Sequence, residues 1–566
     1  MFYPKIIVIM RKMKKWMLAA ILICGTTMLF DSCSSKEDNP VPTEPETVED
    51  GMNKKITNGN YDKSLAVKCI NGTFVGKKTE NVIAYKGIPF VGQQPVGNLR
   101  WKAPVDVAPS NDVYEAYNYG KSSYQPEGDP AYNYTQGEDC LYLNVWKAAE
   151  TSTEKKPVMV WIYGGGFETG GTNDPNYDCQ NFITENPDVI VVTIAYRLGV
   201  YGFLHISHLP DGKDYPDAQN LGLLDQQMAL KWVHENIEGF GGDPDNVTIF
   251  GESAGGASCS LQPLLKGSQK YFKRLIAQSG SPSMTRSAEE SIEYTNKIMD
   301  ALGCKTVADL QKISPRQLAD TQGRLLGMYQ VLGLRSWPER DGRIVPTDPW
   351  EAYASGAVKD IDILHGCNKD EINTFLAALG EENFIKWAAQ RKVEMLSKLT
   401  DGEKALVESY CNDQAEGYEK YSRLIDQWLW IAPVFRMSEN QTMAGGKSYT
   451  YFLTAESAVP LMKSGHATDV PLVFNHPELT ALTGRAYDAT YTKTIRKMWV
   501  QFAKTGNPSL SPDISPDGKA KEWPVYDLGN KQLMILDEFD IHPEKESQRK
   551  IVDWDRTYFL TKYFTI

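Results

Sequence analysis

A serine flanked by glycines lies where a predicted strand turns sharply into a predicted helix. Residues 246–250 (NVTIF) are typical of a buried strand, and the apolar run 257–265 is suited to a helix. Between them, residues 251–256 (GESAGG) contain the pattern G-x-S-x-G around Ser253. A reversal this tight leaves no room for side chains on its flanks, which must therefore be glycine. The pattern predicts a strained backbone and an exposed hydroxyl at Ser253, with the positive end of the following helix directed at the site.

A second glycine loop follows an earlier strand. Residues 157–163 (PVMVWIY) are typical of a buried strand, and Gly164, Gly165 and Gly166 come directly after it. Acyl transfer needs hydrogen-bond donors aimed at a developing oxyanion, and the bare backbone N–H groups of a glycine loop can supply them. A simple glycine turn is the alternative, but two such loops, each after a hydrophobic strand, disfavour it. We expect the N–H groups of Gly165, Gly166 and Ala254 to form an oxyanion hole.

Further segments resemble, in order, the motifs of the type-B carboxylesterase family, the cholinesterase-like branch of the α/β-hydrolases. They are YKGIPF at 85–90, LRWKAP at 99–104, EDCLYLNVW at 138–146, NLGLLDQQMALKWV at 220–233, FGGDPDNVTIFGESAGG at 240–256 and WVQFAKTGNP at 499–508. The resemblance covers about residues 61–566. It implies an α/β-hydrolase fold: a central, mostly parallel twisted sheet with helices on both faces and helical cap insertions. It also implies hydrolysis of carboxylic esters.

The resemblance suggests the acid of a catalytic triad. In α/β-hydrolases the triad follows the chain order serine, acid, histidine. Residues 368–371 (NKDE) resemble the family's N-K-D-E-G block, in which the glutamate is the acid. We therefore expect Glu371 to be the acid, with Asp370 as the fallback, although Ile372 replaces the usual glycine. The predicted strand 361–364 would deliver Glu371 to the carboxyl edge of the sheet.

The base should be one of seven histidines, because it must titrate near neutral pH. Four of them precede Glu371 and break the expected order: His205, His208, His234 and His365. Residues 465–474 (GHATDVPLVF) resemble the family's H-G-x-E-x-x-x-V-F block, so His466 is the expected base, with Ala467 in place of glycine. The competitor His476 stands outside the motif, before a proline.

The implied mechanism uses residue chemistry alone. His466 takes the hydroxyl proton of Ser253 as the serine attacks an ester carbonyl, Glu371 orients the imidazole, and water hydrolyses the acyl-enzyme. No cofactor is expected, and the sequence shows no metal-binding pattern such as H-E-x-x-H. Glu252, beside the nucleophile, leaves two interpretations open. It could tune the histidine or meet cationic substrates, or it could be a buried acid bound by backbone donors.

Two further functions are compatible with this fold. Some relatives use it as a catalytically silent binding module, and a serine peptidase could also be built on it. The chain retains serine, acid, histidine and glycine loop, which favours an active esterase. With a net charge of −12 and a pI of about 5.3, the sequence gives no support for nucleic-acid binding. The expected partner is a small-molecule ester, and the sequence does not indicate an oligomeric state.

The N-terminus resembles a targeting segment. Basic residues at positions 11, 12, 14 and 15 precede a short apolar run, 16–30, and Cys33 follows shortly after. This arrangement resembles a bacterial lipoprotein processing site, and residues 34–38 (SSKED) resemble the acidic surface-export signal of lipoproteins from Bacteroidetes-like bacteria. We expect a signal peptide at 1–32, a lipidated flexible tether at 33–60 and a catalytic domain at 61–566. The protein would then be an outer-membrane lipoprotein attached to the membrane through its lipid alone. The alternative is an ordinary secretory signal with an incidental cysteine.

Overall fold

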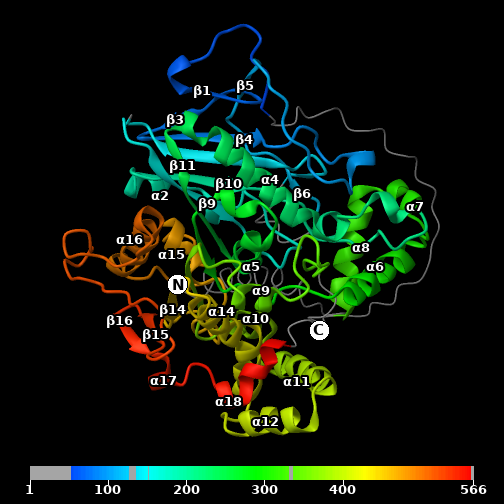
Figure 1. The fold of residues 1–566 in the computed structure, drawn as a ribbon, viewed down its shortest axis with the longest axis vertical. Helices are drawn as coiled ribbons and strands as arrows, with labels where there is room; N and C mark the ends of the chain where they lie inside the picture. The colour runs from blue at the N-terminus through cyan, green and yellow to red at the C-terminus, as the bar shows by residue number, and fades with distance from the viewer. Residues whose placement is uncertain (1–52, 127–134, 151, 330–335, 563–566) are drawn as a thin grey trace, which may run out of the picture.

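A large mixed sheet crosses the molecule (Figure 1). The computed structural model describes residues 53–126, 135–150, 152–329 and 336–562. Within these residues the main sheet has eleven strands in the order β16-β15-β14-β13-β12-β11-β9-β10-β8-β4-β3. The strands are β3 (Lys77–Thr79), β4 (Val82–Pro89), β8 (Tyr142–Ala148), β9 (Lys156–Ile162), β10 (Ile190–Ile194), β11 (Gly242–Glu252), β12 (Arg274–Gln278), β13 (Asp362–Asn368), β14 (Ser448–Leu453), β15 (Gln532–Leu536) and β16 (Ile541–Lys545).

The centre of this sheet is parallel, and its edges are antiparallel. The strands from β10 through β9 and β11 to β15 all run parallel to their neighbours. Strands β8, β4 and β3 at one edge and β16 at the other pair antiparallel. All residues of β10 and β12 are buried, as expected for strands covered on both faces. This arrangement matches the mostly parallel sheet expected from the sequence.

Helices cover both faces of the sheet (Figure 1). One face carries α4 (Leu221–Asn236), α5 (Ala254–Leu261), α9 (Pro349–Ala354) and α14 (Ala432–Met443); the other carries α2 (Gln180–Glu185), α15 (Val470–Phe474) and α16 (Ala489–Thr505). Helix α5 contacts β9, β11 and β12 together, so it lies over the middle of the parallel strands. The two sets of helices bury the apolar side chains of the sheet between them.

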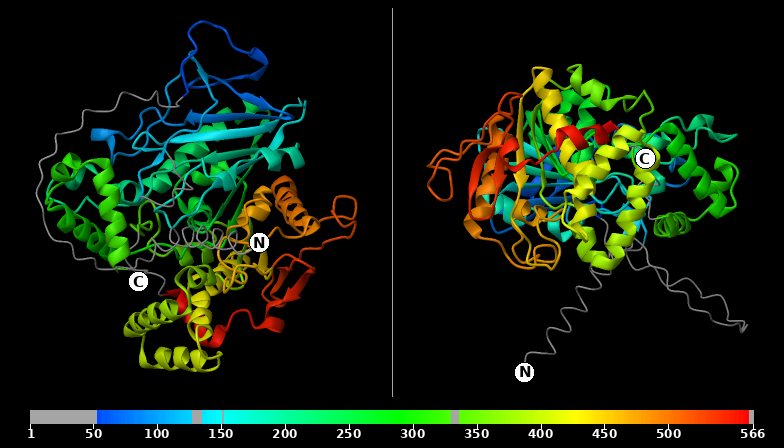
Figure 2. Two further views of the ribbon diagram at one scale, coloured as in Figure 1. Left: turned by 180° about the vertical axis from the view of Figure 1, so that it is seen from behind. Right: turned by 90° about the horizontal axis from the view of Figure 1, so that it is seen from below.

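Two groups of helices lie outside these layers (Figure 2). The first follows α3 (Gly199–Gly202) and contains α6 (Ala288–Leu302), α7 (Val307–Lys312) and α8 (Pro315–Tyr329). The second contains α10 (Asn373–Leu379), α11 (Glu381–Ser397), α12 (Asp401–Asn412), α13 (Glu419–Asp426) and the π-helical turn η10 (Gln427–Ile431). The C-terminal helices α17 (Glu546–Arg549) and α18 (Trp554–Thr557) follow β16, and α18 packs on α12. These groups are the helical insertions expected from the sequence.

The ordered N-terminal part begins before residue 61. The Ile56 N–H donates to the carbonyl of Val113, and Lys55 pairs with Tyr114 in an isolated β-bridge. These contacts join residues 55 and 56 to β5 (Val113–Glu115), which belongs to a small sheet with β1 (Ala66–Cys69) and β2 (Gly72–Val75). A two-stranded sheet joins β6 (Ser122–Ser123) and β7 (Gln136–Gly137). Backbone hydrogen bonds thus fix the chain to β5 from residue 55 onward.

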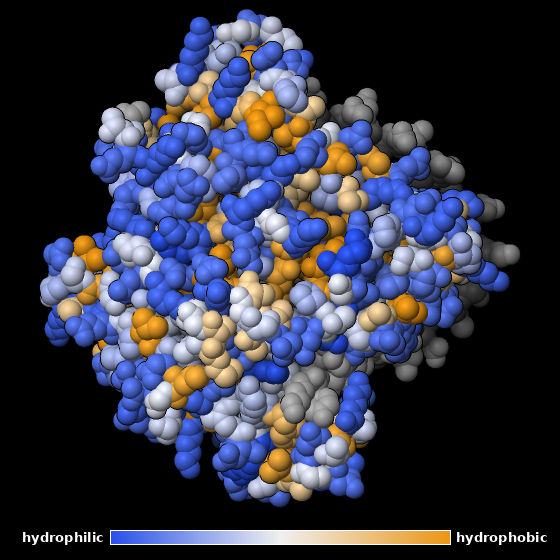
Figure 3. Space-filling view, viewed as in Figure 1, coloured by the Kyte–Doolittle hydropathy of each residue, from blue (hydrophilic) through white to orange (hydrophobic). Residues whose placement is uncertain are grey.

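The face seen in Figure 3 is mostly hydrophilic, with apolar side chains gathered near its centre. Among the described residues, no helix combines the length and the apolar character that crossing a membrane requires. The signal segment and Cys33 lie outside the described residues.

Candidate active site

Ser253 occupies a strained turn between β11 and α5. Its backbone has φ 56° and ψ −122°, a combination that residues other than glycine rarely adopt. Its N–H donates to the carbonyl of Gln278, 2.8 Å away, which ties the turn to the end of β12. A Cβ atom on Gly251 would lie 2.5 Å from the carbonyl carbon of Gly255, and one on Gly255 would lie 1.9 Å from the oxygen of Ile162. Glycine is therefore required on both flanks of the serine, as the sequence predicted.

The glycine loop lies against this turn because β9 and β11 are parallel neighbours. The strands pair Ile162 with Gly251, so each loop leaves the sheet at the same edge. A Cβ atom on Gly164 would lie 3.0 Å from the Cβ of Ser253. Gly165 and Gly166 have positive φ, 106° and 66°. Within the described residues, the N–H groups of Gly165, Gly166 and Ala254 donate to no acceptor, which leaves them available to a ligand.

Glu371 is fully buried just after β13 and accepts several hydrogen bonds. The N–H of Asn368 donates to its Oε1 at 2.7 Å, and the hydroxyl of Ser279 donates to the same oxygen at 2.5 Å. Ser279 follows β12 and has a φ of 51°. Ile372, which stands where the family has glycine, has φ −66°, an ordinary helical value. The turn therefore does not need glycine at that position.

His466 lies directly beside Glu371. Its ring Nδ1 is 2.6 Å from Glu371 Oε2, and its backbone N–H donates to the backbone carbonyl of Glu371 at 3.0 Å. The imidazole belongs to the loop between β14 and α15, and the residue is 9% exposed. Burial opposes the charged imidazole, but the carboxylates of Glu252 and Glu371 outweigh this effect, and the pKa of His466 is raised to about 9. This is the arrangement in which a carboxylate orients an imidazole base.

Glu252 faces the other nitrogen of the same ring. Its Oε1 lies 3.2 Å from His466 Nε2, without the angles of a hydrogen bond. Burial raises the pKa of Glu252 to about 8, against the opposing effect of His466. In the described part of the chain, no hydrogen bond connects the Ser253 hydroxyl to His466. Among the described residues, no backbone donor binds Glu252 Oε1 either, so of the two interpretations the structure favours an acid that acts on the histidine.

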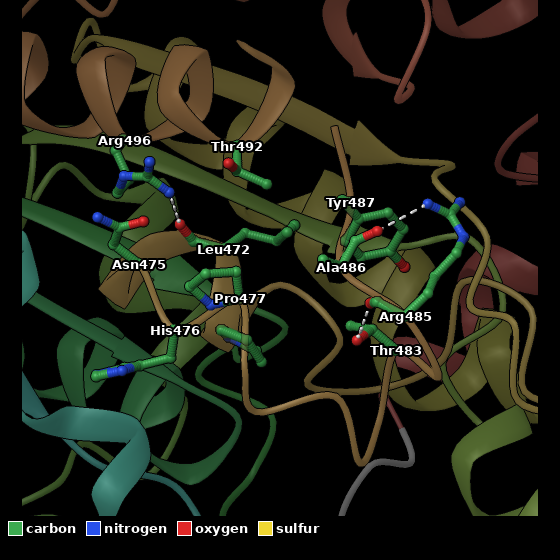
Figure 4. Close-up of a pocket in the computed structure, with 11 residues that line it drawn as sticks. Leu472, Asn475, His476, Pro477, Thr483, Arg485, Ala486, Tyr487, Thr492 and Arg496 are labelled. Atoms are coloured by element: carbon green, nitrogen blue, oxygen red, sulfur yellow. Dashed lines mark hydrogen bonds between the residues drawn. The ribbon is translucent and has the colours of Figure 1, made fainter. Parts of the chain in front are cut away.

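The competing residues have other partners. Asp370 forms an ion pair with Arg423, with Asp370 Oδ1 2.5 Å from a guanidinium nitrogen. His476 lies beside a separate small cavity of about 20 Å³ (Figure 4). Its Nε2 is 2.9 Å from the carbonyl oxygen of Asp178, and its Nδ1 is 3.0 Å from Glu478. Neither residue therefore lies in the position of a triad member.

Three contacts of the site had no signal in the sequence. Ser279 binds Glu371 although the two residues are 92 positions apart. The indole of Trp430, on the π-helical turn, lies 5.2 Å from the His466 ring, and Phe375 stacks on the same ring at 6.4 Å. A π-helical turn often marks a functional site, but nothing in a single sequence locates it. No group of three or more metal-ligating side chains is found among the described residues.

Comparison with known proteins identifies the family. The sequence profile of the carboxylesterase family matches residues 63–551. The chain is 34% identical to the para-nitrobenzyl esterase of Bacillus subtilis (strain 168), over 85% of this chain and 96% of that protein. It is 31% identical to the acetylcholinesterase of Bungarus fasciatus, over 84% of this chain and 83% of that protein.

Solved structures agree with the sequence comparison. The carboxylesterase EST55 of Geobacillus stearothermophilus superposes with a TM-score of 0.75 at 31% identity, over 86% of this chain and 99% of that one. A para-nitrobenzyl esterase structure also gives a TM-score of 0.75, at 30% identity, over 86% of this chain and 98% of that one. These likenesses confirm the α/β-hydrolase fold. The chain belongs to the carboxylesterase family and is a serine hydrolase of carboxylic esters.

Proposed function

We propose that Ser253, His466 and Glu371 are the catalytic triad of this esterase, with the N–H groups of Gly165, Gly166 and Ala254 as its oxyanion hole. The observation that carries the proposal is the 2.6 Å contact of Glu371 with His466, whose Nε2 lies 3.2 Å from Glu252, the residue before the strained Ser253. Glu371 accepts a hydrogen bond from Nδ1–H, which leaves Nε2 as the basic nitrogen of the neutral ring. The acid itself is secured by Ser279 and the Asn368 N–H.

Hydrolysis then follows in two halves. The Ser253 oxygen bonds to the ester carbonyl carbon while His466 Nε2 takes its proton, and the carbonyl oxygen becomes an oxyanion that accepts hydrogen bonds from the glycine loop. The bond to the alcohol oxygen breaks as His466 returns the proton to it. Water repeats the sequence on the acyl-enzyme and releases the acid. Each step uses only groups of this chain, the ester and water.

The free enzyme needs a small movement before this chemistry. His466 Nε2 faces Glu252 rather than Ser253, and hydrogen bonds of the catalytic groups often form only when substrate is bound. A change of the Ser253 side-chain rotamer or of the imidazole would complete the contact. Glu252 would meanwhile stabilise the protonated ring, because its carboxylate lies on the side where the proton arrives.

The decisive experiment replaces the nucleophile. Ser253→Ala should reduce hydrolysis of short-chain nitrophenyl and para-nitrobenzyl esters by on the order of 10⁴-fold or more. The same change should prevent covalent labelling of the native site by an organophosphonate, while the unfolding midpoint stays close to that of the parent. Near-full activity in Ser253→Ala would contradict the proposed triad. Peptide amides should be poor substrates, and hydrolysis of amides at rates similar to esters would favour the peptidase alternative.

We also propose that the protein is anchored to the outer membrane through a lipid on Cys33. The support is the sequence alone: a basic segment, a short apolar run and a cysteine shortly after it. Such an anchor carries at least two acyl chains, which hold a protein at a membrane more firmly than one chain does. The acidic residues after Cys33 favour the outward-facing leaflet.

A further inference from the structure

A second serine, histidine and glutamate lie in hydrogen-bonded order outside the Ser253 site. Ser207 Oγ is 3.1 Å from His205 Nε2, and His205 Nδ1 is 2.6 Å from Glu339 Oε2. His205 and Ser207 stand on the loop after α3, and Glu339 comes from a segment that pairs with Arg286 in an isolated β-bridge. The three residues share none of their contacts with the first triad.

The geometry of this cluster matches what an activated hydroxyl requires. The distance from His205 to Glu339 equals that from His466 to Glu371, 2.6 Å. The serine-to-histidine contact, which is absent between Ser253 and His466, is present here. With Glu339 accepting from Nδ1, His205 Nε2 is the free basic nitrogen and can take the Ser207 proton.

The surroundings fix the acid and leave the serine accessible. Glu339 is 1% exposed, and its backbone forms two hydrogen bonds with the Asn220 side chain, at 2.8 and 2.9 Å. The His205 side chain retains 13% exposure, and Ser207 is half-buried. The acid is therefore buried and the base is partly covered. The serine hydroxyl can still be reached by a small electrophile.

From these contacts we infer that Ser207 is a second nucleophile, activated by His205 and Glu339, that accepts acyl groups from small activated esters. The Ser207 oxygen forms a bond to the carbonyl carbon, and its proton passes to His205 Nε2. The bond to the leaving alcohol or phenol oxygen breaks, and that oxygen receives the proton. The reaction is stoichiometric acylation with slow release by water, because rapid turnover would also require donors aimed at the oxyanion.

The test uses the full chain carrying Ser253→Ala, so that the first site cannot react. A fluorophosphonate reports the same attack: a P–O bond replaces the P–F bond, fluoride leaves, and the adduct is stable enough for peptide mapping. The expected result is one adduct, on Ser207. Adding His205→Gln should slow the labelling about 100-fold, the usual contribution of a positioned base. Adding Ser207→Ala should remove it.

A neighbouring histidine provides the matched control. The His208 ring is 5.4 Å from His205, but its Nε2 faces Asn296 and it is exposed. His208→Ala in the same background should leave the labelling rate unchanged. Absence of an adduct on Ser207, or an adduct that forms at the same rate after His205→Gln, overturns the inference. Glu339→Gln, in which the backbone contacts with Asn220 can persist, gives a second variant if His205→Gln fails to fold, and it should slow labelling as well.

Discussion

At the scale of single residues, Glu252 should set the pH below which the esterase loses activity. The base must be neutral to accept a proton, so activity is lost as the pH falls through the His466 pKa, raised to about 9. Glu252→Gln removes a negative charge 3.2 Å from Nε2, which lowers that pKa. We expect the acid limb of the kcat/KM profile to move about one pH unit lower. The measurement is kcat/KM for a nitrophenyl ester from pH 5 to 10.

A matched control for this change is Glu478→Gln. Glu478 pairs with His476 near the surface, away from the proposed triad, so its removal should leave the profile in place. An acid limb that stays fixed in Glu252→Gln, or moves to higher pH, would show that Glu252 does not stabilise the protonated His466.

The two candidate bases can be separated directly. His466→Ala should reduce kcat by on the order of 10⁴-fold or more, because the loss of a triad histidine removes nucleophile activation. His476→Ala should retain nearly full activity, because its ring binds Asp178 and Glu478 instead. Steady-state kinetics with one nitrophenyl ester suffices. The opposite pattern would mean that the base is His476.

Residue-scale prediction from sequence has a physical limit. Ser253 and the glycine loop could be predicted from the sequence because their signals are local. A tight reversal needs glycine within two positions of the serine. Glu371 and His466 came only from resemblance, since the two residues are 95 positions apart and nothing between them indicates that they meet. Ser279, Trp430 and the cluster at Ser207 were missed for the same reason. Each depends on side chains brought together by distant segments.

At the scale of elements, two substitutions of family glycines differ in their consequences. Ile372 adopts a helical φ and is buried, so its turn formed without strain. Ala467, next to the proposed base, has a φ of 64°. An alanine in the left-handed region costs roughly 1–2 kcal/mol. The loop that positions His466 is therefore strained, and a larger side chain there should disturb it further.

This strain can be measured with a pair of variants. Ala467→Val places a β-branched residue at positive φ and should lower the free energy of unfolding by about 2 kcal/mol. It should also lower kcat, because the peptide bond after His466 must move. Ala467→Gly should retain activity and change stability by less than about 1 kcal/mol, since relief of strain is offset by the greater entropy of the unfolded chain. Urea unfolding and ester hydrolysis check both. Equal stability of the two variants would rule out strain at this position.

Element boundaries show where the sequence pattern was too coarse. The predicted strand 246–250 lies inside the longer β11, which begins at Gly242 and makes an irregular pairing with β9. The predicted helix 257–265 begins earlier, at Ala254, and ends in a 3-10 turn at Gln262. Hydrophobic runs mark buried segments, but the ends depend on caps and on neighbouring strands. The π-helical turn that carries Trp430 has no periodic signal at all.

At the scale of the whole molecule, the sheet and its helices explain why the site is where it is. Parallel strands deliver their carboxyl ends to one edge, so residues after β9, β11, β12 and β13 meet there although they are far apart in sequence. The proposed serine, acid and histidine follow β11, β13 and β14 in chain order. The fold class was predictable because dense motifs span most of the chain, whereas the helical insertions were expected only from the family resemblance, without residue ranges.

The segment before the catalytic domain determines how this molecule is attached to the cell. Backbone hydrogen bonds fix the chain from residue 55 onward, and residues 33–52 would then link the domain to a lipid on Cys33. Twenty extended residues span at most about 70 Å, so the catalytic domain could act away from the membrane surface. We expect the mature protein to begin at acylated Cys33. Mass spectrometry of the native N-terminus and incorporation of labelled palmitate measure this directly.

Two cysteines near the N-terminus allow a matched comparison. Cys33→Ala should abolish palmitate incorporation, because the acyl chains need the thiol and the new N-terminus at that position. Cys24→Ala, which changes a residue inside the apolar run, should leave incorporation intact. An unmodified N-terminus beyond residue 33 would instead indicate a freely secreted or periplasmic esterase. Equal labelling of both variants would show that the acyl chains are not on Cys33. Protease treatment of intact cells then shows which side of the outer membrane carries the protein. Loss of the protein indicates the outer leaflet, and its survival indicates the inner leaflet.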